Sequence, residues 1–125
     1  MGAYDGMAAQ WDVVVVPFPY ADRLAEKRRP ALVVSSVAFH RTTGLMWVVM
    51  ITSTSQHWPG DTEIADHAAC GLPVPSRIRP AKIAAIEASR IVRVAGRIGR
   101  DEIAGVRAGL AAILGPAERS SGAIA

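Results

Sequence analysis

The sequence predicts a mainly β protein with one C-terminal helix, folded as a small SH3-like barrel. Several short runs of β-branched and apolar residues are separated by turn residues, and one amphipathic helix pattern follows them. With 125 residues, 50% of them hydrophobic and 20% charged, the chain suits one packed domain. Closure into a barrel would remove exposed strand edges, which matters for strands this apolar.

Three strands are predicted in the N-terminal half, where β-branched residues are densest. They span residues 12–16, 31–36 and 45–53, and the last is the most apolar run of the chain. Pro17 and Pro19 end the first strand because proline has no backbone N–H to donate to a sheet. Residues 37–44 are expected to be a plain connection with Gly44 as its turn. Trp47 is expected in the core.

The C-terminal half predicts shorter strands and then the helix. The expected strands are residues 62–65, 76–79 and 82–86, the last two on either side of Pro80, with 90–97 as a further strand or irregular edge. The apolar stripe of the helix is formed by Ile103, Val106, Leu110, Ile113 and Leu114. Asp101 and Glu102 favour its N-terminus through the helix dipole, and Gly115-Pro116 end it.

We expect a single domain over residues 11–115, with a mobile tail over 1–10 and a disordered tail over 116–125. The chain has one cysteine, Cys70, so it forms no internal disulfide and a reducing compartment is expected. No signal-peptide pattern is found, and the longest apolar stretch, 45–51, is too short to span a bilayer. We therefore expect a soluble, cytoplasmic protein without a membrane partner.

Two segments carry residue types suited to phosphate chemistry. Arg29 stands directly before Pro30, which biases it towards extended geometry, and a guanidinium presents a planar fork that matches a phosphate. Thr52 and Ser53 end the most apolar strand, and their hydroxyls can donate to phosphoryl oxygens. If the two strands are neighbours, Arg29 and Thr52 face a common groove. The alternatives are a solvated basic loop at 27–29 and hydroxyls that bond the local backbone.

Charge and aromatic residues are compatible with a nucleic-acid partner. The formal net charge is +3, which weakly favours a polyanion. Phe18, Tyr20 and Trp58 fall in predicted loops, where aromatic rings can stack on the bases of single strands. Phe18, between two prolines, is equally suited to plug the barrel.

No metal, cofactor or protein nucleophile is expected. His67 and Cys70 are close in sequence, but no paired cysteine or histidine motif accompanies them. The chain also lacks a Gly-x-Ser-x-Gly elbow and a glycine-rich phosphate loop.

Together these segments resemble the MazF/PemK family of toxins from toxin–antitoxin systems, over about residues 12–114. The resemblance rests on Val13 to Pro19 with its Pro-Phe-Pro, on Arg29-Pro30-Ala31-Leu32-Val33-Val34, and on Val49-Met50-Ile51-Thr52-Ser53. Residues 71–76, the terminal helix and the PemK-like stretch 38–42 extend it. The resemblance implies an SH3-like barrel that dimerises and cuts single-stranded RNA without a metal.

The resemblance also implies site residues and a partner. Arg29 matches the family's catalytic arginine, Thr52 its catalytic threonine, and Arg79 is similar in position to a second functional arginine of the PemK branch. The residues that would lie near the RNA groove are Phe18, Arg28, Ser53 and Lys82. A cognate antitoxin is the implied protein partner, with an acidic segment laid across these basic residues.

The implied reaction is attack by the substrate's own 2′-hydroxyl on the adjacent phosphate, which yields a 2′,3′-cyclic phosphate and a 5′-hydroxyl. Arg29 and Thr52 would stabilise the charge that builds on the phosphorane. The general base stays open among Asp22, Glu26 and His57.

Three features depart from the family pattern. The PemK branch uses a histidine in its first loop, and residues 18–28 contain none. Trp11-Asp12 stands where members usually have Gly-Asp or Gly-Glu, and Ala81 stands where the PemK branch has an acidic residue. Two alternatives therefore stay open: an inactive barrel that only binds single-stranded RNA, and a non-enzymatic toxin like the CcdB gyrase poisons. The C-terminal Trp-Gly-Ile on which those poisons depend is missing.

Overall fold

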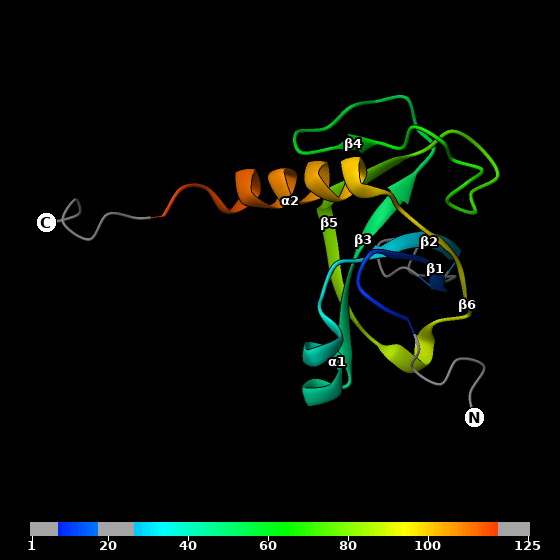
Figure 1. Ribbon diagram of the computed structural model, residues 1–125, viewed down its shortest axis with the longest axis vertical. Helices are drawn as coiled ribbons and strands as arrows, with labels where there is room; N and C mark the ends of the chain where they lie inside the picture. The colour runs from blue at the N-terminus through cyan, green and yellow to red at the C-terminus, as the bar shows by residue number, and fades with distance from the viewer. Residues whose placement is uncertain (1–7, 18–26, 118–125) are drawn as a thin grey trace, which may run out of the picture.

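The computed structural model describes residues 8–17 and 27–117, and in them six strands form one antiparallel sheet of order β4-β5-β3-β2-β1-β6. The elements are β1 (Asp12–Pro17), β2 (Arg28–Val33), α1 (Val37–Thr43), β3 (Leu45–Thr52), β4 (Thr62–Glu63), β5 (Arg77–Glu87), the 3-10 helix η1 (Ala88–Arg90), β6 (Arg93–Arg97) and α2 (Arg100–Leu114). The sheet curls into a half-barrel, α2 crosses one end of it, and α1 lies beside β3 (Figure 1). The predicted mainly β fold with a C-terminal helix is confirmed.

Some of the predictions fall outside the described residues. They concern Phe18, Tyr20, Asp22 and Glu26, and most of both predicted tails. The residues just before β1 are described and pack on the sheet: Ala8 is buried, and Gln10 Nε2 donates to the Val34 carbonyl at 2.9 Å.

Residues 37–44 form the short helix α1, so the expectation of a plain connection was wrong. Ser36 caps the helix, because its Oγ accepts a hydrogen bond from the Phe39 N–H at 3.1 Å. Gly44 ends it in the left-handed conformation at φ 78°, as the expected turn residue. The helix contains no buried residue, and it therefore has no apolar stripe for a periodicity argument to find.

The two short strands expected around Pro80 are one strand, β5. Met50 pairs with Arg79 whereas Val49 pairs with Ile83, so Pro80, Ala81 and Lys82 leave the ladder as a bulge. Because a bulged residue needs no ladder donor, proline is tolerated inside the strand. Beyond β5, η1 occupies residues 88–90, and the strand expected from residue 90 begins at Arg93.

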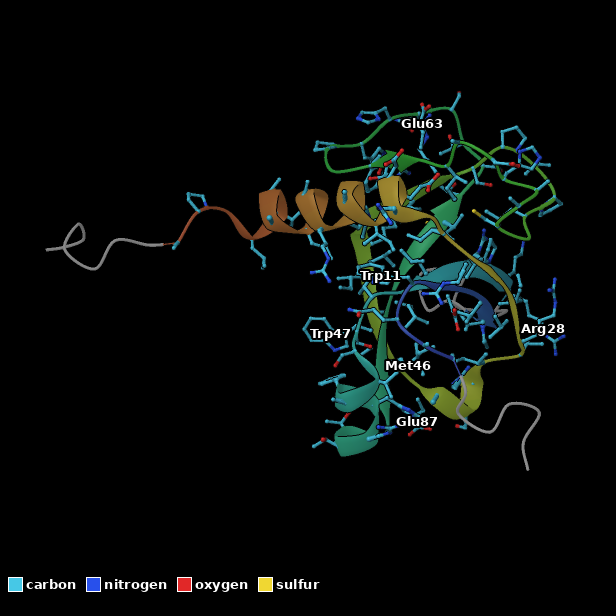
Figure 2. All side chains as sticks on the ribbon, viewed as in Figure 1. Trp11, Arg28, Met46, Trp47, Glu63 and Glu87 are labelled. Carbon is cyan, nitrogen blue, oxygen red and sulfur yellow. The ribbon has the colours of Figure 1, made fainter. Side chains whose placement is uncertain are left out.

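Trp47 is not a core residue. Its neighbours Met46 and Val48 are buried, but Trp47 points from the opposite face of β3 and is 48% exposed. Figure 2 shows it beside α1, where its ring meets that of Phe39 edge-on at a centroid distance of 5.9 Å. Val49 and Ile51 lie further along the same face of β3 as Trp47 and are buried in a core cluster, so Trp47 stands on a face that is covered further along but not at this position.

Two core clusters lie on opposite faces of the curled sheet. Along β1, Val13 belongs to the cluster beneath α2, whereas Val14 and Val16 belong to the other. Trp11, one of the departures from the family pattern, is buried in the cluster beneath α2 together with Val106 of that helix. Val15 faces the same side as Val13 but is only half-buried, because a cavity opens beside it.

The first turns of α2 attach it to the sheet. Val106 is fully buried, and the Glu102 carboxylate accepts hydrogen bonds from the backbone N–H groups of Gly99 and Ala65, both at 3.1 Å. The acidic residue expected to favour the N-terminus therefore also ties the helix to the chain after β4. The end of the predicted apolar stripe is exposed: Ile113 is 49% and Leu114 84% accessible.

A close backbone approach holds the loop over residues 70–76 against β6. Gly71 has φ +81°, and a side chain at Gly71 or at Gly96 would collide with the backbone of Ala95 or of Cys70, respectively. Glycine is therefore required at both positions, and the loop becomes a wall of the cavity beside Val15.

Candidate functional site

A cavity of about 300 Å³ lies at one end of the sheet and collects residues from four strands and one loop. Its lining consists of Val15, Arg29, Pro30, Ile51, Thr52, Ser53, Gly71, Leu72, Pro73, Val74, Ser76, Arg93 and Ala95. The structure thus brings together Arg29, Thr52 and Ser53, three of the residues singled out from the sequence.

Strand register explains why Arg29 and Thr52 meet. On β2 and β3, Ala31 pairs with Met50, and the same antiparallel register continued by two residues sets Arg29 opposite Thr52. Val15 pairs with Pro30 on one side and with Arg93 on the other, so one cross-strand row contributes Arg93, Val15 and Pro30 to the cavity. The expected common groove between the two strands is present.

The polar atoms of Arg29 and Thr52 are available to a ligand. Arg29 Nε is buried and has no hydrogen-bond partner among the described residues, and an unpaired buried N–H is costly unless a ligand satisfies it. Thr52 Oγ1 accepts a hydrogen bond from the Thr54 N–H at 3.3 Å, which leaves the hydroxyl proton free to donate.

Arg93 is a cation of this cavity that the sequence interpretation did not single out. It stands on β6, and its side chain makes no hydrogen bond or ion pair with another residue in the described parts of the chain. The sequence held one signal, the alternation of apolar and basic residues over 90–97, but that pattern cannot say which basic residue lies beside β1. With Arg29 and Arg93, the cavity has two guanidinium groups and an anion is the ligand that they favour.

Arg79 is placed differently from the other candidates. It is 4% exposed and does not line the cavity; its Nε and Nη2 donate to both oxygens of Asp61 at 3.2 and 2.9 Å. Its Nη2 also donates to the Gln56 carbonyl at 2.6 Å, and its guanidinium lies 4.2 Å from the centre of the Trp58 ring. These contacts hold the loop between β3 and β4 in place.

The charge of Asp61 is maintained by this arrangement. Burial alone would raise the pKa of Asp61, but the hydrogen bonds from Arg79 and from the Trp58 N–H, with the charges of Arg79 and His57, lower it below its ordinary value of 3.8. Asp61 is therefore an ionised partner for Arg79 at neutral pH.

The remaining candidates lie around the cavity rather than in it. Lys82 is on the β5 bulge, with its ammonium 5.2 Å from the centre of the Trp58 ring. Arg28 is exposed at the start of β2, where Figure 2 shows it at the edge of the molecule. His57 does not line the cavity, and its Nδ1 lies 3.1 Å from Arg77 Nη1. Phe18 is outside the described residues.

Within the described residues, no group of three or more histidine, cysteine or carboxylate side chains is arranged to hold a metal ion. Burial, and then the charges of Glu102 and Asp66, raise the pKa of Cys70, so this residue is a buried thiol and not a reactive thiolate. None of the helices in the part of the chain that the structure describes has the length and hydropathy needed to cross a membrane.

Fold and cavity together define a class: a small curled antiparallel β protein with a cationic, hydroxyl-lined cavity suited to a phosphate. The model of the PemK-like, MazF-like toxins of type II toxin-antitoxin systems matches residues 9–114, and the chain belongs to this family. The resemblance inferred from the sequence is thereby confirmed. A search of curated proteins found no match.

Solved structures share the fold. MazF from Deinococcus radiodurans is 28% identical, with a TM-score of 0.70 over 86% of this chain and 96% of that one. The MazE-MazF complex from the same organism is 24% identical, with a TM-score of 0.68 over 88% and 97%. An endoribonuclease in complex with its cognate antitoxin, from Mycobacterial species, is 18% identical, with a TM-score of 0.73 over 90% and 99%.

Proposed function

We propose that this protein is a sequence-specific, metal-independent endoribonuclease that cleaves single-stranded RNA and is neutralised by a cognate antitoxin. The observation that carries the proposal is the meeting of Arg29 and Thr52 at one cavity, with Arg29 Nε buried and unpartnered among the described residues. A phosphate oxygen is the group that would satisfy both a guanidinium N–H and a threonine hydroxyl.

In the reaction we propose, the ribose 2′-oxygen attacks the adjacent phosphorus and the bond from phosphorus to the 5′-oxygen breaks. The 2′-hydroxyl loses its proton to a base, and the leaving 5′-oxygen gains one, so the products are a 2′,3′-cyclic phosphate and a 5′-hydroxyl. Arg29 and Thr52 stabilise the extra negative charge on the phosphorane, and this is their catalytic role. Because the nucleophile belongs to the RNA, the chain needs no nucleophile of its own.

Arg93 supplies the second positive charge of the proposed site. It lines the cavity from β6, across β1 from Pro30, and so holds the RNA backbone from the side opposite to Thr52. Ser53, directly after β3, adds a further hydroxyl. Arg28, Lys82 and Phe18 extend the RNA-binding surface, whereas Arg79 acts on RNA only through the loop that it holds.

The proposed protein partners are an antitoxin and a second copy of the chain. Two of the similar structures are described as complexes of such a toxin with its antitoxin. An acidic antitoxin segment is attracted to a cavity with two cations whose charge no described carboxylate neutralises, and it would block access of RNA. We place this activity in the cytoplasm, where RNA is the available substrate.

The test is cleavage of a long unstructured RNA in EDTA by the wild-type protein and by two variants. Arg29→Ala should lose at least about 100-fold in rate, because one donor to the developing charge is gone. Arg97→Ala is the matched control, since Arg97 lies on β6 but outside the cavity, and it should cleave at the wild-type rate.

The chemical groups at the ends of the cleaved RNA identify the reaction in the same assay. Ends with a 5′-hydroxyl and a cyclic phosphate, absent with Arg29→Ala, support the proposal. Tight RNA binding without cleavage by the folded wild-type protein would favour the inactive RNA-binding barrel, and inhibition of gyrase by the pure protein would favour the CcdB-like alternative.

A further inference from the structure

A second hollow adjoins the candidate catalytic cavity. Its volume is about 240 Å³, and it shares Ser53 and Ser76 with the first cavity. A linear polymer bound in the first cavity can therefore continue into the second hollow along the protein surface. The proposed substrate is such a polymer, so the occupant of the second hollow is expected to be the adjacent part of the RNA.

Arg77 lies in the wall of this hollow, and each of its three guanidinium nitrogens already has a partner. Nε donates to the Thr54 carbonyl at 3.2 Å, Nη1 lies 3.1 Å from His57 Nδ1, and Nη2 donates to the Ser55 carbonyl at 3.4 Å. Nη2 also donates to the Glu63 carboxylate at 3.3 Å. A phosphate would have to displace these partners, so the hollow is not a second phosphate site.

Glu63 sets the chemistry of the hollow. Its side chain is 75% exposed, and one oxygen, Oε2, is held by Arg77. The other oxygen has no partner among the described residues. A carboxylate only accepts hydrogen bonds and repels a phosphate, so it favours a neutral group that offers N–H donors.

Within RNA, the bases are the neutral groups with N–H donors. Adenine, cytosine and guanine each present an exocyclic amino group, whereas uracil presents one N–H between two carbonyl oxygens that the carboxylate would repel. Ile64 and Pro75 give the hollow apolar surface for the flat face of a base.

We infer that this hollow is a nucleobase subsite for a nucleotide next to the scissile phosphate, and that Glu63 selects a base with an amino group against uracil. The inference rests on the proposed ribonuclease function, because the subsite is defined by its position beside the scissile phosphate. Selection of the base by Glu63 requires RNA binding but not RNA cleavage. Glu63 is therefore the specificity-determining residue of this subsite.

The first test is the sequence profile of cleavage sites in a random RNA pool. With the wild-type protein, uracil should be depleted about tenfold at one position beside the cut, the size expected for one charge-assisted hydrogen bond. Glu63→Gln, which offers a donor as well as an acceptor, should restore uracil there. Glu87→Gln, at the other end of β5, is the matched control and should keep the wild-type profile. A profile that Glu63→Gln leaves unchanged would overturn the inference.

The second test separates the subsite from catalysis. A random pool of 2′-fluoro RNA has no attacking hydroxyl and cannot be cleaved by the proposed reaction. Enrichment of amino-bearing bases at one position by the wild-type protein, lost with Glu63→Gln, supports the subsite even if no RNA is ever cut. Cleavage of ordinary RNA combined with an unselective 2′-fluoro pool would overturn the subsite and leave the proposed function standing.

Discussion

Two pairs of arginines on the same sheet differ in what surrounds them. Arg77 and Arg79 on β5 are bound by the carboxylates of Glu63 and Asp61, and Arg79 is buried against Trp58. Arg29 on β2 and Arg93 on β6 line a cavity and have no carboxylate partner among the described residues. The first pair therefore organises a loop of the protein, and the second pair leaves its charge for a ligand.

This difference shows that a basic residue cannot be assigned to a binding site from its charge alone. The resemblance to the PemK branch pointed to Arg79 as a functional arginine, and the sequence offered no separate reason to choose Arg93. In the structure Arg79 is bound to Asp61, whereas Arg93 lines the cavity.

The largest expected effect is on stability, from the buried pair. Asp61→Ala leaves the buried Arg79 guanidinium without its carboxylate and should lower the free energy of unfolding by about 3 kcal/mol. Arg29→Ala should change it by less than about 0.5 kcal/mol, because no ion pair is lost. Urea denaturation of both variants measures the free energy of unfolding. Equal losses in the two variants would contradict the separate roles of the two arginine pairs.

Thr52→Val should have the next largest effect, on cleavage. The substitution keeps the shape of the side chain but removes the hydroxyl donor, which should cost about 30-fold in cleavage rate, or about 2 kcal/mol for a hydrogen bond to a charged group. Single-turnover kinetics on a defined RNA measures the rate. The melting temperature serves as the control for folding, and an unchanged rate would remove Thr52 from the site.

Arg93→Gln should weaken RNA binding about fivefold and change its salt dependence. The loss of one phosphate contact lowers the slope of log affinity against log salt concentration by about 0.7 for a single strand. Titrations of a 2′-fluoro RNA at several salt concentrations give the slope. Arg97→Gln on the same strand is the control, because Arg97 lies outside the cavity and donates to the Gln10 carbonyl at 3.3 Å. The same slope for Arg93→Gln and wild type would contradict the role of Arg93.

The smallest expected effect is a pH dependence. The pKa of Asp61 is lowered in the fold, so its contribution to stability is complete above the unfolded value of about 3.8 and is lost as the pH falls through the lower folded value. Between pH 5 and about pH 2, the wild-type protein should therefore lose more stability than Asp61→Asn does. Melting temperatures across this range compare the two proteins, and parallel curves would show that Asp61 is not the group that titrates.

Local sequence determined much of this protein. Apolar side chains repeat about every two residues in a strand and about every 3.6 residues in a helix. A short segment of sequence is enough to show either repeat. Arg29 before Pro30 and Thr52 at the end of an apolar run were also singled out locally as residues suited to phosphate chemistry, and the resemblance to the toxin family added their implied catalytic roles. Helix α1 was missed because it has no buried face, and Trp47 was misplaced because an apolar run does not reveal where along a strand the core ends.

Only the tertiary structure decided which of these side chains act together. The sheet order sets β6 beside β1 and so adds Arg93 to the cavity, and the pairing of β2 with β3 sets Arg29 opposite Thr52. The fold likewise brings Asp61 to Arg79, which removes that arginine from direct contact with the cavity. The physical reason is that the alternation of side chains along a strand shows which residues share a face, but not which strands lie beside it. The partner of a charged side chain likewise depends on residues far away in the sequence.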